Sequence, residues 1–355
     1  VRVGDPGAVI AQKQRTWILL GSVAYFGAAL VDYRWLKWLG IPMYAAGVAM
    51  LVKLLSMGSE VHQLQIGPVS FQPTQLIIAA GIIMIGLTFE LFPRIHRSLG
   101  HPMVKLLLIG LLCGAPFLLV VKNGDMGSAI VWLPVAAVAM LVGGIPFRYL
   151  LFLALIGIGL VPLLFFIALP AASERGEARV NQYLEILEAG YVEETEENYA
   201  PYWVTMAVGK AGWKGVGWNA DADRGSIHDK KYIPWKTAHN DYIFAVIAEE
   251  QGFRGSLLLI TGFGLLLIQC LFIAFYSRDF SGQIIASGVV ALFFAHIFEN
   301  IGMCVSLMPI TGIPLPLISY SGTFVIICMF LLGMVQSVWV HRNIGVKEQP
   351  EEQAA

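Results

Sequence analysis

Residues 256–276 have the sequence SLLLITGFGLLLIQCLFIAFY, a run without a single charged side chain. A helix rises about 1.5 Å per residue, so this run covers the roughly 30 Å of hydrocarbon in a bilayer. Comparable runs recur along the chain, which is 57% hydrophobic and 13% charged, with a mean hydropathy of +0.70. The expected fold class is therefore all-α, a polytopic integral membrane protein.

The apolar runs predict about nine transmembrane helices. We expect them near residues 16–32, 40–57, 75–91, 104–121, 127–144, 149–169, 256–276, 283–308 and 318–340. The net charge of −1 gives no indication of a nucleic-acid partner. The four cysteines fall within spans, where we expect small, buried apolar residues: Cys113, Cys270, Cys304 and Cys328.

The basic residues of the short loops predict the orientation, because cytoplasmic loops carry an excess of Lys and Arg. The alternate short loops on one side hold little beyond Lys122. The loops on the other side hold Arg34, Lys37, Arg94, Arg97, Arg148 and Arg278, and the C-terminal end adds Arg342 and Lys347. This second set should be cytoplasmic, which places residues 171–240 outside.

Residues 171–240 interrupt the apolar pattern with 11 of the 24 acidic residues and 8 of the 23 Lys and Arg residues. We expect one large extracellular loop within a single membrane domain that spans residues 1–355. A polar loop of this size is where a membrane protein is expected to carry its chemistry.

Two long motifs follow this loop. Residues 239–255 are His-Asn-Asp-Tyr-Ile-Phe-Ala-Val-Ile-Ala-Glu-Glu-Gln-Gly-Phe-Arg-Gly, and residues 309–322 are Pro-Ile-Thr-Gly-Ile-Pro-Leu-Pro-Leu-Ile-Ser-Tyr-Ser-Gly. Together they resemble the SEDS family of shape, elongation, division and sporulation proteins, and the second motif is most similar to its RodA branch. Weaker matches follow in the family's order at residues 71–74, 125–128, 212–218 and 300–303.

The resemblance also shows where this chain departs from the family. The family has ten spans with both ends cytoplasmic, and by motif this chain begins after the first, so we expect one span to precede Val1. Gln75 replaces a family glutamate, Gln63 replaces a common tryptophan, and Ser321 replaces a glycine.

The resemblance implies a peptidoglycan glycosyltransferase in the bacterial inner membrane. It would polymerise lipid II into glycan strands at the outer face, for cell elongation and rod shape, with a class B penicillin-binding protein as partner. Two alternatives stay open at this point: a flippase or transporter of lipid-linked precursors, and a non-catalytic scaffold for a penicillin-binding protein.

Asp241 is the candidate catalytic base. The α-linked donor and β-linked product require inversion, which needs a base on the acceptor hydroxyl and help for the undecaprenyl diphosphate leaving group. The alternative is that Asn240 and Asp241 cap the helix that follows. The resemblance favours the catalytic role.

Further candidates for substrate binding share a polar character in or beside apolar segments. His296, Glu299 and Asn300 fall on one helix face inside a span, where ionisable residues are costly and usually functional, although a hydrogen-bonded structural cluster is the alternative. The remaining candidates are Asp125, Lys122, Arg179, Lys210, Lys214, His239, Glu249 and Ser319. The basic ones could bind the diphosphate or be solvated loop charges, and Glu249 with Glu250 could be a solvated pair.

No metal ligand set is assigned, but a divalent cation, Mg²⁺ or Mn²⁺, bridging Asp241, Asp125 and diphosphate oxygens is chemically reasonable.

Three expectations concern the surroundings of Asp241. A straight helix from Asp241 to Tyr276 would be about 54 Å long, too long for one crossing, so a break is expected at residues 252–255. The three prolines of residues 309–316 predict a rigid external turn, as a rim of the active cavity or as a simple hairpin. The small residues of 261–264 are a candidate contact for the partner's membrane helix, or internal packing.

Overall fold

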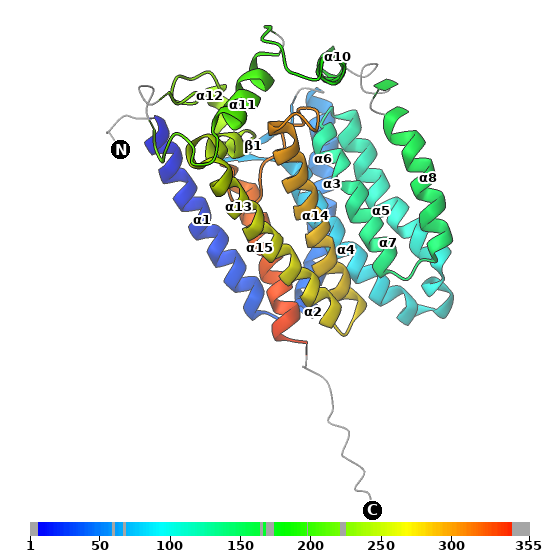
Figure 1. Cartoon of the computed structure of the whole chain (residues 1–355). Coiled ribbons are helices and arrows are strands. Elements are labelled where there is room, and N and C mark those ends of the chain that lie inside the picture. The colour runs from blue at the N-terminus through cyan, green and yellow to red at the C-terminus, as the bar shows by residue number, and fades with distance from the viewer. Residues whose placement is uncertain are drawn as a thin grey trace, which may run out of the picture.

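The computed structural model describes residues 6–58, 61–66, 69–163, 166–167, 174–196, 198–220 and 225–342, which form a bundle of long helices with further elements at its two ends (Figure 1). The long helices are α1 (Pro6–Leu30), α3 (Gly40–Met57), α4 (Pro73–Ile95), α5 (Pro102–Lys122), α7 (Trp132–Val142), α8 (Phe147–Leu163), α13 (Ile243–Tyr276), α14 (Phe280–Cys304) and α15 (Gly322–Val340).

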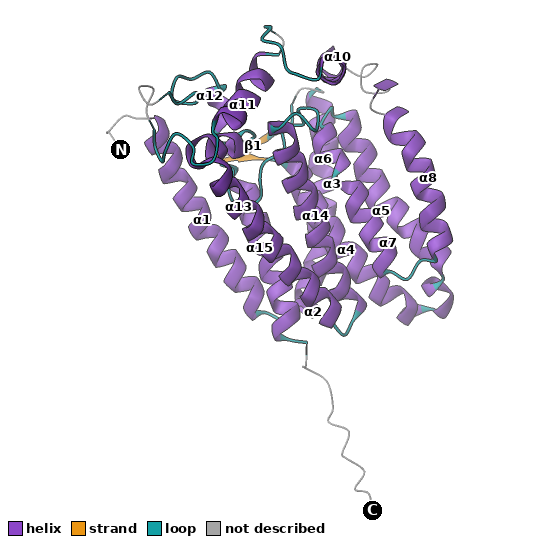
Figure 2. Ribbon diagram, in the orientation of Figure 1, coloured by secondary structure: helices purple, strands orange, loops and turns teal. Residues whose placement is uncertain are grey.

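Shorter or peripheral elements connect the helices of the bundle. They are α2 (Tyr33–Leu36), the 3₁₀ helices η1 (Lys37–Leu39) and η2 (Arg97–Gly100), the strands β1 (Leu64–Ile66) and β2 (Val69–Phe71), and the helices α6 (Met126–Ile130), α10 (Glu174–Ala189), α11 (Tyr199–Lys210) and α12 (Trp235–Ala238). The two strands pair antiparallel, with Leu64 opposite Phe71, and lie at the end of the bundle that carries α10, α11 and α12 (Figure 2).

The helices confirm an all-α, polytopic membrane protein. Six segments among the described residues are long and apolar enough to cross a membrane: Tyr33–Met57, Pro73–Ile95, Pro102–Lys122, Ile243–Tyr276, Phe280–Cys304 and Gly322–Val340. The predicted spans 16–32, 127–144 and 149–169 overlap α1, the shorter pair α6 and α7, and α8. Residues 164–165 and 168–169 of the last lie outside the described residues.

The predicted boundaries are wrong around the second motif. The span expected to end at residue 308 ends at Cys304, and the span expected to begin at residue 318 begins at Gly322. Ser306 has φ 58°, which ends α14 before the first proline is reached, and Leu317 has φ 65°, so the residues between α14 and α15 form an irregular segment.

Helices α4 and α14 form the centre of the bundle. The most apolar stretch of α14 is 78% buried and that of α4 is 67% buried, against 17% for α13. Helix α14 packs against α4, α7, α13 and α15, and α1 packs along α15. Gly288 lets α14 approach α4 closely, because a Cβ there would lie 2.6 Å from the Ile82 side chain. The exposed apolar faces of α13 suit contact with lipid.

The predicted break in α13 is confirmed at Gly252, where φ is 67° and ψ is −166° inside an otherwise helical segment. The turn at residues 212–217 packs directly against this break. Phe253 N donates to Gly212 O over 2.8 Å, which replaces a helical hydrogen bond that the break removes. A Cβ on Gly252 would overlap the backbone nitrogen of Gly215, so the two glycines allow the close approach.

The basic loops lie at the opposite end of the bundle from the strands. There Arg34 lies 3.8 Å from Asp279, and Lys37 forms a buried ion pair with Glu90 over 2.5 Å. Figure 1 places α2 at this end and α10, α11 and α12 at the other. The structure thus separates the basic short loops from the polar 171–240 segment, as the charge pattern predicts.

Candidate functional site

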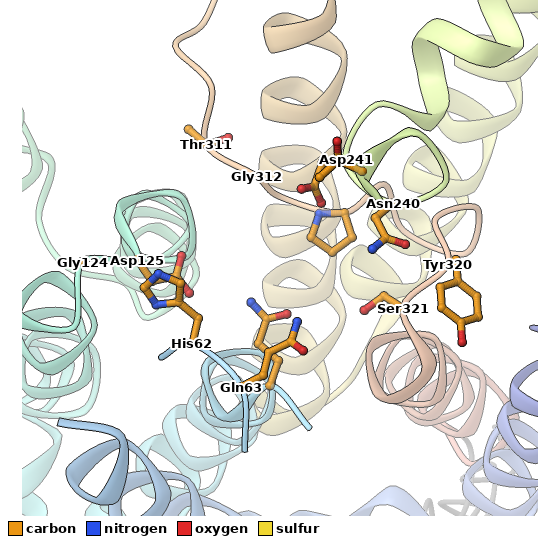
Figure 3. A pocket seen from close by; sticks show the side chains of 13 residues that line it. His62, Gln63, Gly124, Asp125, Asn240, Asp241, Thr311, Gly312, Tyr320 and Ser321 are labelled. Atoms are coloured by element: carbon orange, nitrogen blue, oxygen red, sulfur yellow. The ribbon is translucent and has the colours of Figure 1, made fainter. Parts of the chain in front are cut away.

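A cavity of about 330 Å³ opens at the end of the bundle that carries the strands (Figure 3). Its size falls within the usual range of small-molecule sites. Five chain segments supply its walls: His62 and Gln63, Gln72, Gly124 and Asp125, Thr237 with Asn240 and Asp241, and finally Thr311, Gly312, Pro314, Tyr320 and Ser321. Both long motifs and two of the weaker ones therefore meet at this cavity.

Asp241 and Asp125 lie on different sides of the cavity (Figure 3). Asp241 lies two residues before Ile243, the first residue of α13, and Tyr242 occupies the N-cap position of that helix. Asp125 does cap a helix: its Oδ1 accepts a hydrogen bond from Ser128 N at the start of α6 over 3.1 Å. Asp125 Oδ2 is buried and has no hydrogen-bond partner among the described residues, so it is available to a ligand.

Asn300 is fully buried in α14 and fixes the backbone around Asp241. Its Nδ2 donates to Asp241 O over 2.8 Å and to Ile313 O over 2.7 Å. Its neighbour Glu299 is also buried and lies close enough to Asp125 for their charges to interact. His296 is buried one turn earlier, with Nδ1 3.2 Å from the carbonyl oxygen of Pro314.

Ser319 fixes the residue before Asp241. Its hydroxyl donates to Asn240 O over 2.5 Å and accepts from Leu315 N over 2.7 Å. Tyr320 N donates to His239 O over 2.9 Å. The structure thus brings the predicted residues Asn300, Ser319 and His239 to the site. Their hydrogen bonds hold the 239–241 backbone, and none of the three lines the cavity.

The remaining predicted site residues lie elsewhere. Glu249 is buried against residues 227–228 of the loop that precedes the site. Lys122, Lys210 and Lys214 are exposed and do not line the cavity, although Lys122 lies two residues before Gly124. The side chain of Arg179 lies outside the described residues.

A second hollow shares a wall with the cavity. Gln63, Gln72, Asn240, Tyr320 and Ser321 line both. The second hollow also contains Lys13 and Trp17 from the N-terminal half of α1, and Trp17 packs against Gly322 at the start of α15. The Lys13 ammonium group is therefore a positive charge beside the Asp241 cavity, and the sequence did not indicate it.

The donor set of the cavity gives limited support for a metal ion. The two carboxylates of Asp241 and Asp125 line one space, and one buried oxygen of Asp125 has no partner among the described residues. No group of three or more His, Cys, Asp or Glu side chains in the described part of the chain is arranged to hold a metal. A bound Mg²⁺ or Mn²⁺ would therefore need substrate oxygens to complete its coordination.

Sequence reasoning missed several lining residues, notably His62, Gln72 and Thr237. Gln72 belongs to the weaker motif match at residues 71–74 (Phe-Gln-Pro-Thr), which could have indicated it as a site residue. His62 lines the cavity from the segment just before β1. Gln75 is buried at the start of α4, and its amide atoms lack hydrogen-bond partners among the described residues.

Comparisons with known proteins identify the family of this chain. The family model for FtsW, RodA and SpoVE cell cycle proteins matches residues 1–344. The peptidoglycan glycosyltransferase MrdB of Escherichia coli K12 is 30% identical over 292 residues, covering 82% of this chain and 73% of the relative. The peptidoglycan glycosyltransferase RodA of Treponema pallidum is 25% identical, covering 95% and 92%.

Solved structures show the same fold. A chain of a peptidoglycan synthase complex that coordinates polymerisation and crosslinking superimposes with a TM-score of 0.74 at 25% identity, covering 96% of this chain and 92% of that one. The rod shape determining protein RodA of Thermus thermophilus gives a TM-score of 0.66 at 25% identity, covering 96% and 89%. Because the family model matches 344 of its 355 residues, this chain belongs to the FtsW, RodA and SpoVE family, which confirms the SEDS resemblance.

Proposed function

We propose that Asp241 is the general base with which this peptidoglycan glycosyltransferase polymerises lipid II. The observation that carries the proposal is the placement of Asp241: its carboxylate lines a polar cavity, while Asn300 and Ser319 fix the backbone on either side of it. A base must be held in one position to accept a proton efficiently, and rigid support of this kind supplies that.

The reaction follows from this placement. Asp241 accepts the proton of the acceptor hydroxyl as its oxygen forms a bond to the anomeric carbon of the donor sugar. The bond from that carbon to the diphosphate oxygen breaks on the opposite face, which inverts the configuration. Undecaprenyl diphosphate leaves with the bonding electron pair.

The diphosphate leaving group needs positive charge or hydrogen-bond donors as it departs. Lys13 in the adjoining hollow is a candidate cation, and it replaces Lys122, Lys210 and Lys214 because those three do not line either space. Asp125 faces the cavity from the other side and suits acceptor hydroxyls or a bound divalent cation, whose chemistry would be to neutralise diphosphate charge.

The orientation proposed for the chain places this cavity at the outer face of the bacterial inner membrane. The excess of Lys and Arg in the loops at the opposite end supports it. Lipid II, the nascent strand and membrane lipid would meet the protein there.

A class B penicillin-binding protein is the proposed partner, because polymerised strands need peptide crosslinks. The small residues of α13 offer a contact: Thr261 and Gly262 are exposed, and a Cβ added at Gly262 or Gly264 would meet nothing within 4 Å. This open surface favours an external contact over internal packing.

The test is a polymerisation assay on the purified chain in lipid vesicles with lipid II. The wild-type chain should form glycan strands, and Asp241→Ala should form none while binding lipid II. Glu188→Gln, a change of an exposed carboxylate in α10, is the matched control and should retain activity. If glycan strands formed only when a partner protein was present with this chain, and Asp241→Ala supported their formation as well as the wild type, the chain would be a scaffold instead.

A further inference from the structure

A cluster of ionisable side chains lies behind the cavity, outside the set that lines it. Glu249, which is 2% exposed, accepts hydrogen bonds from the backbone nitrogens of Ile227 and His228. Its Oε2 also lies 2.8 Å from His228 Nδ1. The other ring nitrogen, Nε2, lies 3.6 Å from Glu250 Oε1. One imidazole therefore bridges two adjacent carboxylates of α13.

The loop around His228 is held by packing and polar contacts of its own. Ile227 and Ile233 are buried, and Tyr232 stacks on Trp203 of α11 with ring centroids 4.2 Å apart. The Ser226 hydroxyl lies 2.9 Å from His228 Nδ1.

The position of the cluster along the chain links it to the site. His228 precedes Asp241, and Glu249 follows it, so their contact closes residues 228–249 into a ring. Thr237, Asn240 and Asp241 lie inside this ring and line the cavity. A contact that closes the ring restricts the backbone that carries Asp241.

The charged groups that face the imidazole in the described structure are Glu249 and Glu250 on α13 and Asp229 on its own loop. Burial alone would lower the pKa of His228, but the hydrogen bond to Glu249 and the negative charges of the three carboxylates outweigh it, so the pKa of His228 is raised above 6.5. A protonated imidazole bridges both carboxylates. A neutral one can donate from only one nitrogen and leaves two adjacent negative charges unneutralised.

We propose that His228 is a positioning residue for the glycosyl transfer: its bridge to Glu249 and Glu250 holds the Asp241 segment in place and is released when the imidazole loses its proton, so that polymerisation responds to external pH. This inference rests on Asp241 being the base. Because Asn300 and Ser319 still hold the Asp241 backbone, release should weaken catalysis and not abolish it.

The experiment compares pH profiles of kcat and KM for purified protein with lipid II in vesicles. In the wild type, kcat should fall on the alkaline side, above pH 6.5, as the bridge is lost. His228→Gln should lower kcat by up to about 100-fold, the scale of a misplaced catalytic group, and remove the alkaline fall, with KM little changed. Lys230→Gln, an exposed neighbour, is the control and should follow the wild type.

Glu250→Gln gives the sharper readout, because it removes one of the charges that raises the pKa of His228. Its alkaline fall should shift to lower pH, and hydrogen-exchange protection of residues 226–234 should shift with it. An unshifted Glu250→Gln profile, or an alkaline fall that persists in His228→Gln, would overturn the bridge. If those results came with an inactive Asp241→Asn, only the bridge would fail; an active Asp241→Asn would overturn the proposed function.

Discussion

Asn300 holds Asp241 through a single side-chain amide group: Nδ2 donates to the Asp241 carbonyl oxygen over 2.8 Å and to the Ile313 carbonyl oxygen over 2.7 Å. The amide thereby joins the two long sequence motifs inside the bundle. A residue of the central helix α14 thus fixes the position of a loop residue at the cavity, which is how a rigid scaffold supports a catalytic group.

Asn300→Asp replaces the donor with an acceptor and should therefore break both hydrogen bonds. The two carbonyl oxygens lose their donor in a buried place, a cost of about 1–3 kcal/mol for each unsatisfied group. We expect kcat to fall strongly with little change in KM, measured by lipid II polymerisation. Asn300→Ser, which keeps a small donor, should retain more activity. Equal activity of Asn300→Asp and the wild type would contradict a supporting role.

Gly252→Ala should lower the melting temperature of the purified protein. At φ 67° a side chain is strained, and a Cβ there would overlap the Gly215 backbone, with an expected cost of about 1–3 kcal/mol or more. Gly262→Ala is the matched control, because it lies in the same helix with nothing within 4 Å of the added Cβ. It should leave the melting temperature unchanged or raise it. Similar losses from both substitutions would argue against the break as a required feature.

The bridge at His228 should also make stability depend on pH. The pKa of His228 is raised in the folded protein, so its stabilising contribution is fully present below 6.5 and is lost as pH rises through the folded value. The melting temperatures of the wild type and His228→Gln should differ most on the acid side and converge on the alkaline side. A difference that grows with rising pH would have the wrong sign for this account.

The orientation can be tested with single cysteines, since the four native cysteines are buried. A membrane-impermeant maleimide applied from outside should label Glu188→Cys in α10 and miss Arg278→Cys between α13 and α14. Both positions are exposed in the structure, so the membrane alone should separate them. Labelling of Arg278→Cys alone would reverse the orientation and place the cavity in the cytoplasm.

The sequence predicted the membrane fold because the apolar run of each helix is a local property. It also predicted the break at Gly252, since helix length and the position of glycine are read along one stretch of chain. It misplaced the ends of α14 and α15, because the positive φ angles of Ser306 and Leu317 leave no trace in the hydropathy pattern. The hairpin of β1 and β2 was not predicted, because three-residue strands carry too little pattern.

The candidate site was only partly predictable. Asp241 and Asp125 stood out through their motifs, and both line the cavity. Nothing local indicates that Lys214 does not line the cavity while Lys13 lines the adjoining hollow, because the folding of the chain decides this. Nor could the pattern distinguish substrate contact from backbone support at Asn300 and Ser319, since a buried amide or hydroxyl suits both.

The central claim, that Asp241 accepts the proton of the acceptor hydroxyl, is tested most directly by Asp241→Asn. The amide has nearly the same shape but cannot take a proton. Lipid II binding and glycan polymerisation should be measured on the same purified sample, beside the wild type. The account predicts binding close to that of the wild type with no detectable polymer. Polymer formed at a rate near that of the wild type would contradict it.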